Sequence, residues 1–201
     1  MKKIVVLGST GSIGESTLRV VEALPSRLKV VGLAANRSHK RVLQQAKQFH
    51  VPRVAVADPG AARLCAAEAP AGVRVLEREK GVEEIAALDE ADVVLCALVG
   101  MAGLKPVMAA LEKGKDVALA TKEVLVAAGA IVTGLAARKG CRLLPVDSEH
   151  SAVFQCLQDR RQKAEDRRQH PEVRRIILTA SGGPFALKPD VDFDKVTVAE
   201  A

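Results

Sequence analysis

Hydrophobic residues follow two alternating patterns along most of this chain. Short continuous apolar runs, rich in valine, isoleucine and leucine, are typical of strands that are covered on both faces. The segments between them repeat apolar residues every three or four positions, as helices do. We expect strands over residues 3–8, 28–34, 51–58, 73–76, 92–98, 116–121 and 141–146, and helices over residues 12–24, 39–50, 61–69, 80–88, 103–114 and 122–140. This alternation predicts an α/β fold built on a doubly wound parallel sheet.

The pattern changes after about residue 146. Residues 157–175 contain seven basic and four acidic residues, a composition typical of a solvated helix and loop. A new apolar run at residues 176–180 ends in Ser181-Gly182-Gly183, a turn whose free N–H groups suit an anion or a hydroxyl. We therefore expect one domain over residues 1–146 and the beginning of a second, α+β domain over residues 147–201.

Composition narrows the class of partner. The net charge of +6 favours an anionic partner, but only 2% of the residues are aromatic, which leaves almost nothing to stack on nucleic-acid bases. A phosphorylated small molecule fits better than a nucleic acid. The four cysteines show neither C-x-x-C nor metal-ligand spacing, so we expect reduced thiols in a cytoplasmic protein. The uncharged stretches are shorter than the roughly 20 residues that span a bilayer, so we expect no membrane segment.

The segment GSTGSIG, residues 8–14, follows the first expected strand and opens the first expected helix. A Rossmann-like domain places its phosphate-binding turn there, although the glycines of this chain are spaced G-x-x-G-x-x-G. We expect Gly8 to end the strand, Gly11 to admit a pyrophosphate, and Gly14 to bring the helix close to the sheet. Ser12 is a candidate cap for that helix. Glycine also marks ordinary turns, so it is the position that favours a nucleotide.

The end of the second strand indicates which dinucleotide binds. An NAD site places Asp or Glu there, whereas this chain reads Asn36-Arg37-Ser38. Arg37 suits the 2′-phosphate of NADPH, with Asn36 and Ser38 as neutral donors. Such a charge-assisted contact favours NADPH over NADH by roughly 10- to 150-fold. The alternative is that Arg37 is an ordinary surface arginine.

Two carboxylates follow the last expected strand. Asp147 and Glu149 are two positions apart, and in an extended backbone they would point to the same side. Such a pair at the carboxyl edge of a sheet suits Mg²⁺ or Mn²⁺, although D-S-E is equally typical of a solvated helix start capped by Asp147 or Ser148. Lys122 and Glu123 follow another strand at the same edge. Lys122 suits a substrate hydroxyl or phosphate, and Glu123 suits a role in fixing either the cofactor or a catalytic lysine.

Read together, the segments LGSTGSIG, LATKEVLV, LLPVDSEHSAVFQ and LTASGGPF resemble the 1-deoxy-D-xylulose 5-phosphate reductoisomerase family. The resemblance implies an NADPH- and divalent-metal-dependent homodimer of non-mevalonate isoprenoid biosynthesis that makes 2-C-methyl-D-erythritol 4-phosphate. A cation (Mg²⁺, Mn²⁺ or Co²⁺) would chelate the carbonyl and hydroxyl oxygens of the substrate during the rearrangement, and NADPH would then deliver hydride. The implied positions are NADPH contacts at Thr10, Gly11, Ser12, Ile13, Asn36, Arg37, Ser38, Thr121 and Glu123, substrate contacts at Lys122, Ser148, Glu149 and Ser181, metal ligands at Asp147 and Glu149, and catalytic roles for Lys122, Asp147 and Glu149.

The chain departs from the family pattern in two ways. The family usually reads A-N-K-E where this chain has Ala120-Thr121-Lys122-Glu123, so a hydroxyl replaces an amide that would touch the cofactor. Family members also run to about twice this length, and their later part supplies another metal-ligating glutamate, phosphate-binding residues and a lid. We therefore expect these 201 residues to be an incomplete form that is inactive alone.

Two other functions remain open at the level of sequence. One is a different NADPH-dependent reductase acting on a phosphorylated or acidic substrate, which the succession of VDSEH and SGGPF disfavours. The other is a non-catalytic NADP(H)-binding module, which would have little use for a carboxylate pair beside Lys122.

Overall fold

The computed structural model describes residues 1–163 and, beyond them, residues 175, 185, 188, 190–192, 194–197 and 199–200. The chain divides into two compact units, Met1–Phe154 and Gln155–Ala201. In the second unit a short turn is closed by Thr197, whose backbone N–H and hydroxyl both donate to the Glu200 carboxylate. No helix in the described part of the chain is long and apolar enough to cross a membrane. The division at residue 146 expected from sequence stays a prediction.

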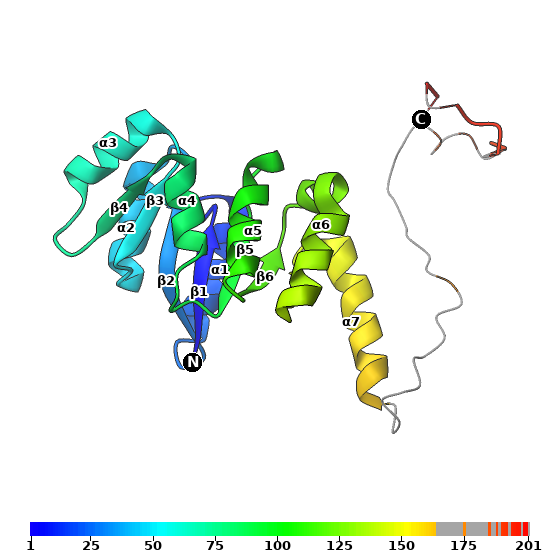
Figure 1. Cartoon of the computed structure of the whole chain (residues 1–201), viewed down its shortest axis with the longest axis horizontal. Coiled ribbons are helices and arrows are strands. Elements are labelled where there is room, and N and C mark those ends of the chain that lie inside the picture. The colour runs from blue at the N-terminus through cyan, green and yellow to red at the C-terminus, as the bar shows by residue number, and fades with distance from the viewer. Residues whose placement is uncertain are drawn as a thin grey trace. The chain divides into compact units, whose positions relative to one another are not determined.

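One parallel sheet organises the described residues, with the strand order β4-β3-β2-β1-β5-β6-β7. Its strands are β1 (Lys2–Leu7), β2 (Leu28–Ala35), β3 (Arg53–Val56), β4 (Arg74–Glu77), β5 (Val93–Cys96), β6 (Asp116–Leu119) and β7 (Leu143–Pro145). The helices are α1 (Ser12–Ala23), α2 (His39–Phe49), α3 (Pro59–Glu68), α4 (Arg78–Ala86), α5 (Leu104–Glu112), α6 (Glu123–Lys139) and α7 (Ser148–Lys163), with the 3₁₀ turn η1 at Gly100–Gly103. Figure 1 shows the alternation of strands and helices along this sheet.

Helices cover both faces of the sheet, each over its own core. Leu18 of α1 and Val42 of α2 belong to one buried cluster, and Ile85 of α4, Val107 of α5 and Leu135 of α6 belong to the other. The chain runs outward from β1 to β4 and then returns to the far side of β1 at β5. With right-handed crossovers, that reversal moves the connecting helices to the opposite face. The predicted doubly wound α/β fold is confirmed.

The reversal creates a switch point between β1 and β5, where the loops after these strands diverge to opposite faces. Open α/β sheets bind ligands at such a point, outside the carboxyl ends of the strands. Those ends are level across the sheet, because Leu7 pairs with Cys96, Cys96 with Leu119, and Leu119 with Pro145. The loops that carry the candidate functional residues therefore leave from a single edge.

Candidate functional site

The turn after β1 depends on two glycines for its own packing. Gly8 has a φ of +82°, and a Cβ there would lie 2.4 Å from the carbonyl oxygen of Ala97. A Cβ on Gly14 would lie 2.3 Å from the carbonyl oxygen of Gly8 and 2.5 Å from the Cα of Ser9. Gly14 therefore packs α1 against the turn itself rather than against the sheet. A Cβ on Gly11 would meet nothing closer than that same oxygen of Gly8, at 3.5 Å.

Gly11, rather than Ser12, caps helix α1. Gly11 has an extended backbone, its carbonyl accepts from the N–H of Glu15 at 2.8 Å, and no side chain caps this end of the helix. The prediction of a Ser12 cap was wrong because the turn places Ser12 one residue inside the helix, where its side chain is exposed. The first N–H groups of a helix have no partner within the helix. Without a side-chain cap, those of α1 are suited to an anion.

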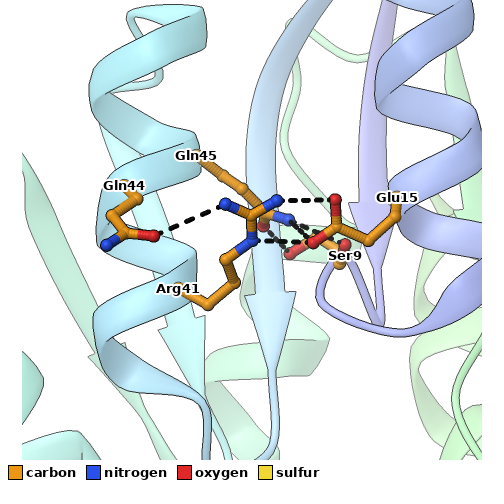
Figure 2. Close-up of polar contacts among 5 residues, drawn as sticks. All are labelled: Ser9, Glu15, Arg41, Gln44 and Gln45. Carbon is orange, nitrogen blue, oxygen red and sulfur yellow. Dashed lines mark hydrogen bonds and ion pairs between the residues drawn. The ribbon is translucent and has the colours of Figure 1, made fainter.

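A polar network that sequence reasoning missed holds the turn from behind (Figure 2). The buried Ser9 donates its hydroxyl to Gln45 Oε1 at 2.7 Å, and Gln45 Nε2 donates to the Ser9 carbonyl at 3.0 Å and to Glu15 Oε1 at 3.0 Å. Arg41 pairs with both oxygens of Glu15, each at 2.8 Å. The hydrogen bond from Arg41 lowers the pKa of Glu15 below its ordinary value.

The residues after β2 are exposed, and an acid from the neighbouring strand reaches one of them. Arg37 is 80% exposed, and its Nε lies 3.4 Å from Asp58 Oδ2. Asp58 also caps α3, where its Oδ1 accepts from the N–H groups of Gly60 and Ala61. The hydrogen bond from Ala61, with a smaller contribution from the charge of Arg37, lowers the pKa of Asp58. The end of β2 does lack an acid, as expected, but Asp58 brings one beside Arg37 from the end of β3.

Lys122 and Asp147 meet at the ends of β6 and β7. Lys122 Nζ lies 3.4 Å from Asp147 Oδ2, and His150 Nδ1 lies 2.9 Å from Asp147 Oδ1. The pKa of Asp147 falls to about 2, first through the hydrogen bond with His150, then through Glu149 and Lys122. Of the two geometries that the sequence left open, the structure has the helix start and not the extended pair, because α7 begins at Ser148 and places Glu149 in its first turn.

The remaining predicted contacts have different degrees of exposure. Thr121 is buried, and its hydroxyl donates to the carbonyl oxygen of Leu98, so this side chain ties the end of β6 to the loop after β5. Glu123, in the first turn of α6, and Ser148 are exposed. Ser181 lies outside the described residues.

The donors at the end of β7 have the chemistry of a site for a hard cation, but they are few. Carboxylate oxygens of Asp147 and Glu149 suit Mg²⁺ or Mn²⁺. Among the described residues, no group of three or more His, Cys, Asp or Glu side chains is arranged to hold a metal. A cation bound by this pair would also have to displace Lys122 and His150 from Asp147. We therefore expect only weak metal binding by these residues.

A shallow groove links the start of α1 to the end of β7. It has a volume of about 390 Å³ and is lined by Ser12, Ile13, Ser16, Thr17, Val20 and Val146. Val146 directly precedes Asp147, and Ser12 and Ile13 open the helix that follows the glycine turn. Two predicted cofactor contacts, Ser12 and Ile13, and the residue that precedes the predicted cation ligand Asp147 thus line one hollow.

The sequence matches two family models in chain order. Residues 4–129 match the model described as 1-deoxy-D-xylulose 5-phosphate reductoisomerase, and residues 143–201 match the model of the C-terminal domain of the same enzyme. The reductoisomerases of Thermoanaerobacter pseudethanolicus and Acaryochloris marina are each 46% identical to this chain, over its whole length. The alignments cover 50% and 49% of those proteins, so the chain spans about half the length of the curated relatives it matches.

Solved structures agree with the family models. The reductoisomerase from Zymomonas mobilis in complex with NADPH is 41% identical, with a TM-score of 0.74 over 80% of this chain and 43% of that one. A reductoisomerase in complex with NADPH, fosmidomycin and magnesium is 35% identical, with a TM-score of 0.76 over 81% of this chain and 40% of that one. Together with the fold and the arrangement of the switch-point edge, these matches show that the chain belongs to the 1-deoxy-D-xylulose 5-phosphate reductoisomerase family.

Proposed function

We propose that this chain is the NADPH-binding part, with the start of the catalytic part, of an enzyme that converts 1-deoxy-D-xylulose 5-phosphate to 2-C-methyl-D-erythritol 4-phosphate. The carrying observation is that the uncapped start of α1, the exposed Arg37 and the Lys122–Asp147 pair all leave the same edge of the sheet. Relatives crystallised with NADPH and with magnesium support both cofactors. The reaction would belong to non-mevalonate isoprenoid biosynthesis.

NADPH would lie across the carboxyl edge, with its pyrophosphate at the start of α1. The N–H groups there have no side-chain cap, and Gly11 leaves room above them. Arg37, with Asn36 and Ser38 beside it, would receive the 2′-phosphate. The other NADPH contacts in this proposal are Thr10, Ser12, Ile13, Thr121 and Glu123. Thr121 is buried and its hydroxyl is bonded to Leu98, so its contact would come from its backbone.

Asp147 and Glu149 would hold the divalent cation, and Lys122 and Ser148 would contact the substrate, with Ser181 as a further contact. When bound, the cation polarises the oxygens of the substrate and NADPH supplies the hydride. Lys122 carries its positive charge to within 3.4 Å of Asp147, so it is placed to bind an anionic oxygen of a substrate held there. Manganese as a metal that the site accepts, a homodimer of the full-length protein and a cytoplasmic location are further parts of this proposal.

The first experiment is calorimetric titration of NADPH and of NADH into the folded 201-residue chain at fixed salt. We expect NADPH to bind roughly 10- to 150-fold more tightly than NADH, because Arg37 adds a charge-assisted contact to the 2′-phosphate. Equal affinities in a folded chain would contradict the role of Arg37. Absence of binding would contradict the proposed cofactor site.

The proposed reaction requires a version of the protein with the length of its relatives. Metal-dependent consumption of NADPH with 1-deoxy-D-xylulose 5-phosphate would support it, and Asp147→Asn should abolish that turnover. Turnover that survives Asp147→Asn would favour a different reductase. NADPH binding without any turnover would favour a non-catalytic module.

A further inference from the structure

We propose that Gln45 is a positioning residue for cofactor binding, which holds the glycine turn in its binding conformation through a two-point clamp on Ser9. This inference rests on the proposed binding of NADPH at that turn. Gln45 lies on α2, which carries none of the predicted cofactor contacts. Gln45 is 1% exposed as a residue, so its polar side chain is buried among the elements that surround it.

The clamp uses both ends of the Gln45 amide on a single residue of the turn. Gln45 Oε1 accepts from the Ser9 hydroxyl at 2.7 Å, while Gln45 Nε2 donates to the Ser9 carbonyl at 3.0 Å. Figure 2 shows the Gln45 side chain reaching from α2 to Ser9. Because a side-chain oxygen and a main-chain oxygen of Ser9 are held together, the Ser9–Thr10 peptide group cannot rotate without breaking one of these bonds.

That peptide group orients the donors that follow it. On its other side the turn is fixed by the N–H groups of Gly8 and Ser9, which both donate to the Ala34 carbonyl at 2.9 Å. Gly8 has a positive φ, which glycine adopts without steric strain but does not by itself enforce, because glycine has many other backbone conformations open to it. The clamp therefore adds a restraint from α2 to the one from β2, directly before the N–H groups proposed to bind the pyrophosphate. Preorganised donors bind an anion more tightly than donors that must first be ordered.

Two charged residues hold the clamp in register. Gln45 Nε2 also donates to Glu15 Oε1 at 3.0 Å, and Arg41 closes on both oxygens of Glu15. Glu15 belongs to the first turn of α1, so the network joins α2 both to the turn and to the helix start. The amide nitrogen of Gln45 thus makes two hydrogen bonds and the amide oxygen one, and all three go to the turn or to the start of α1.

The test compares Gln45→Leu with Gln48→Leu in the 201-residue chain. Gln48 lies on the same helix and also bonds to α1, donating to Glu22 at 3.1 Å, but it does not touch the turn. Two ligands are titrated, NADPH and adenosine 2′-monophosphate. The second reaches the Arg37 region but lacks the pyrophosphate. Amide hydrogen exchange at Ser9–Gly11 and the thermal unfolding midpoint are measured on each variant.

We expect Gln45→Leu to weaken NADPH about tenfold. The affinity for adenosine 2′-monophosphate should stay within about twofold of the original, and amide exchange at Ser9–Gly11 should become faster. Gln48→Leu should leave both affinities and the amide exchange unchanged. Ser9→Ala keeps the bond from Gln45 to the Ser9 carbonyl, so it should weaken NADPH binding less than Gln45→Leu does. An equal loss for both ligands would overturn the proposal in favour of general destabilisation, and unchanged NADPH affinity would overturn it directly. If the original chain binds no NADPH, the proposed function fails as well, and the amide exchange then shows whether the clamp itself exists.

Discussion

The three glycines of GSTGSIG should respond differently to the same substitution, because only two of them are required by the protein itself. An alanine at position 8 would need a left-handed backbone, and its Cβ would lie 2.4 Å from the carbonyl oxygen of Ala97. The Cβ of an alanine at position 14 would lie 2.3 Å from the carbonyl oxygen of Gly8. At Gly11 the nearest heavy atom is 3.5 Å away, an ordinary contact. We therefore expect Gly11→Ala to spare the fold and damage the function.

The expected stabilities follow from these distances. Gly11→Ala loses roughly 0.5–1 kcal/mol because alanine is a poor helix cap, and regains about 0.4–1 kcal/mol because the unfolded chain becomes less flexible. Its melting temperature should stay within about 2 °C of the original. Gly14→Ala forces a backbone overlap that costs about 1–3 kcal/mol, which lowers the melting temperature by roughly 3–9 °C. Gly8→Ala adds about 1–2 kcal/mol of left-handed strain to a similar overlap.

The assay is thermal unfolding of each variant followed by titration of NADPH into those that remain folded. A methyl group on Gly11 would occupy the approach of the pyrophosphate, so we expect affinity to fall at least tenfold, or about 1.4 kcal/mol. If the Gly11→Ala variant binds NADPH as tightly as the original chain, the pyrophosphate does not approach Gly11. If the variant unfolds, the space at Gly11 is too small for a methyl group.

Three further changes test the charged groups of the site. Arg37→Ala should weaken NADPH by roughly 10- to 150-fold and leave NADH nearly unchanged, as measured by calorimetry. The lowered pKa of Glu15 means that its pairing with Arg41 stabilises the fold above the ordinary carboxyl pKa, and that this stabilisation is lost as pH falls through the lowered value. Glu15→Gln should therefore remove part of the acid-induced decline in the free energy of unfolding, as measured by urea titration at a series of pH values. Asp147→Asn should abolish the weak binding of Mn²⁺, as followed by water proton relaxation. The same change should leave the affinity for NADPH, measured by calorimetry, unaltered.

The elements of the fold could be predicted from sequence because each depends on a local repeat of apolar residues. For Glu149 the sequence left two conformations open, an extended one and a helix start, since a strand and a helix meet within a few residues of Pro145. The first turn of α7 begins at Ser148, so the two-residue spacing to Asp147 does not follow strand geometry. Spacing rules that hold within one strand or one helix do not apply across the junction between the two.

Gln45 carried a signal that periodicity alone could have found. It lies three positions after Val42 and four before Phe49, on the apolar face of α2, where a polar side chain requires a buried partner. The identity of that partner was beyond reach, because Ser9 is 36 residues away and meets Gln45 only through the packing of α2 on the sheet. Sequence can thus flag a buried amide without saying what it holds.

Asp58 presents the same limit and leads to a last prediction. The sequence Asp58-Pro59 is typical of a helix start, but the proximity of Asp58 to Arg37 depends on the pairing of β2 with β3, in which Ala35 lies opposite Val56. Asp58 therefore has opposite effects on two neighbours. Its carboxylate accepts hydrogen bonds from the start of α3, but its negative charge would repel a 2′-phosphate bound at Arg37.

Asp58→Asn separates these two roles. Asparagine caps a helix about as well as aspartate, so the unfolding free energy should change by less than about 0.5 kcal/mol. Removal of the charge frees Arg37 and relieves the repulsion, so we expect NADPH to bind about two- to fivefold more tightly at low salt, with no change for NADH. Asp58→Ala is the control that loses the cap, at a cost of about 1 kcal/mol. If Asp58→Asn instead weakened NADPH, the carboxylate would be holding Arg37 in place for the phosphate, and the 3.4 Å contact would be part of cofactor recognition rather than a competitor of it.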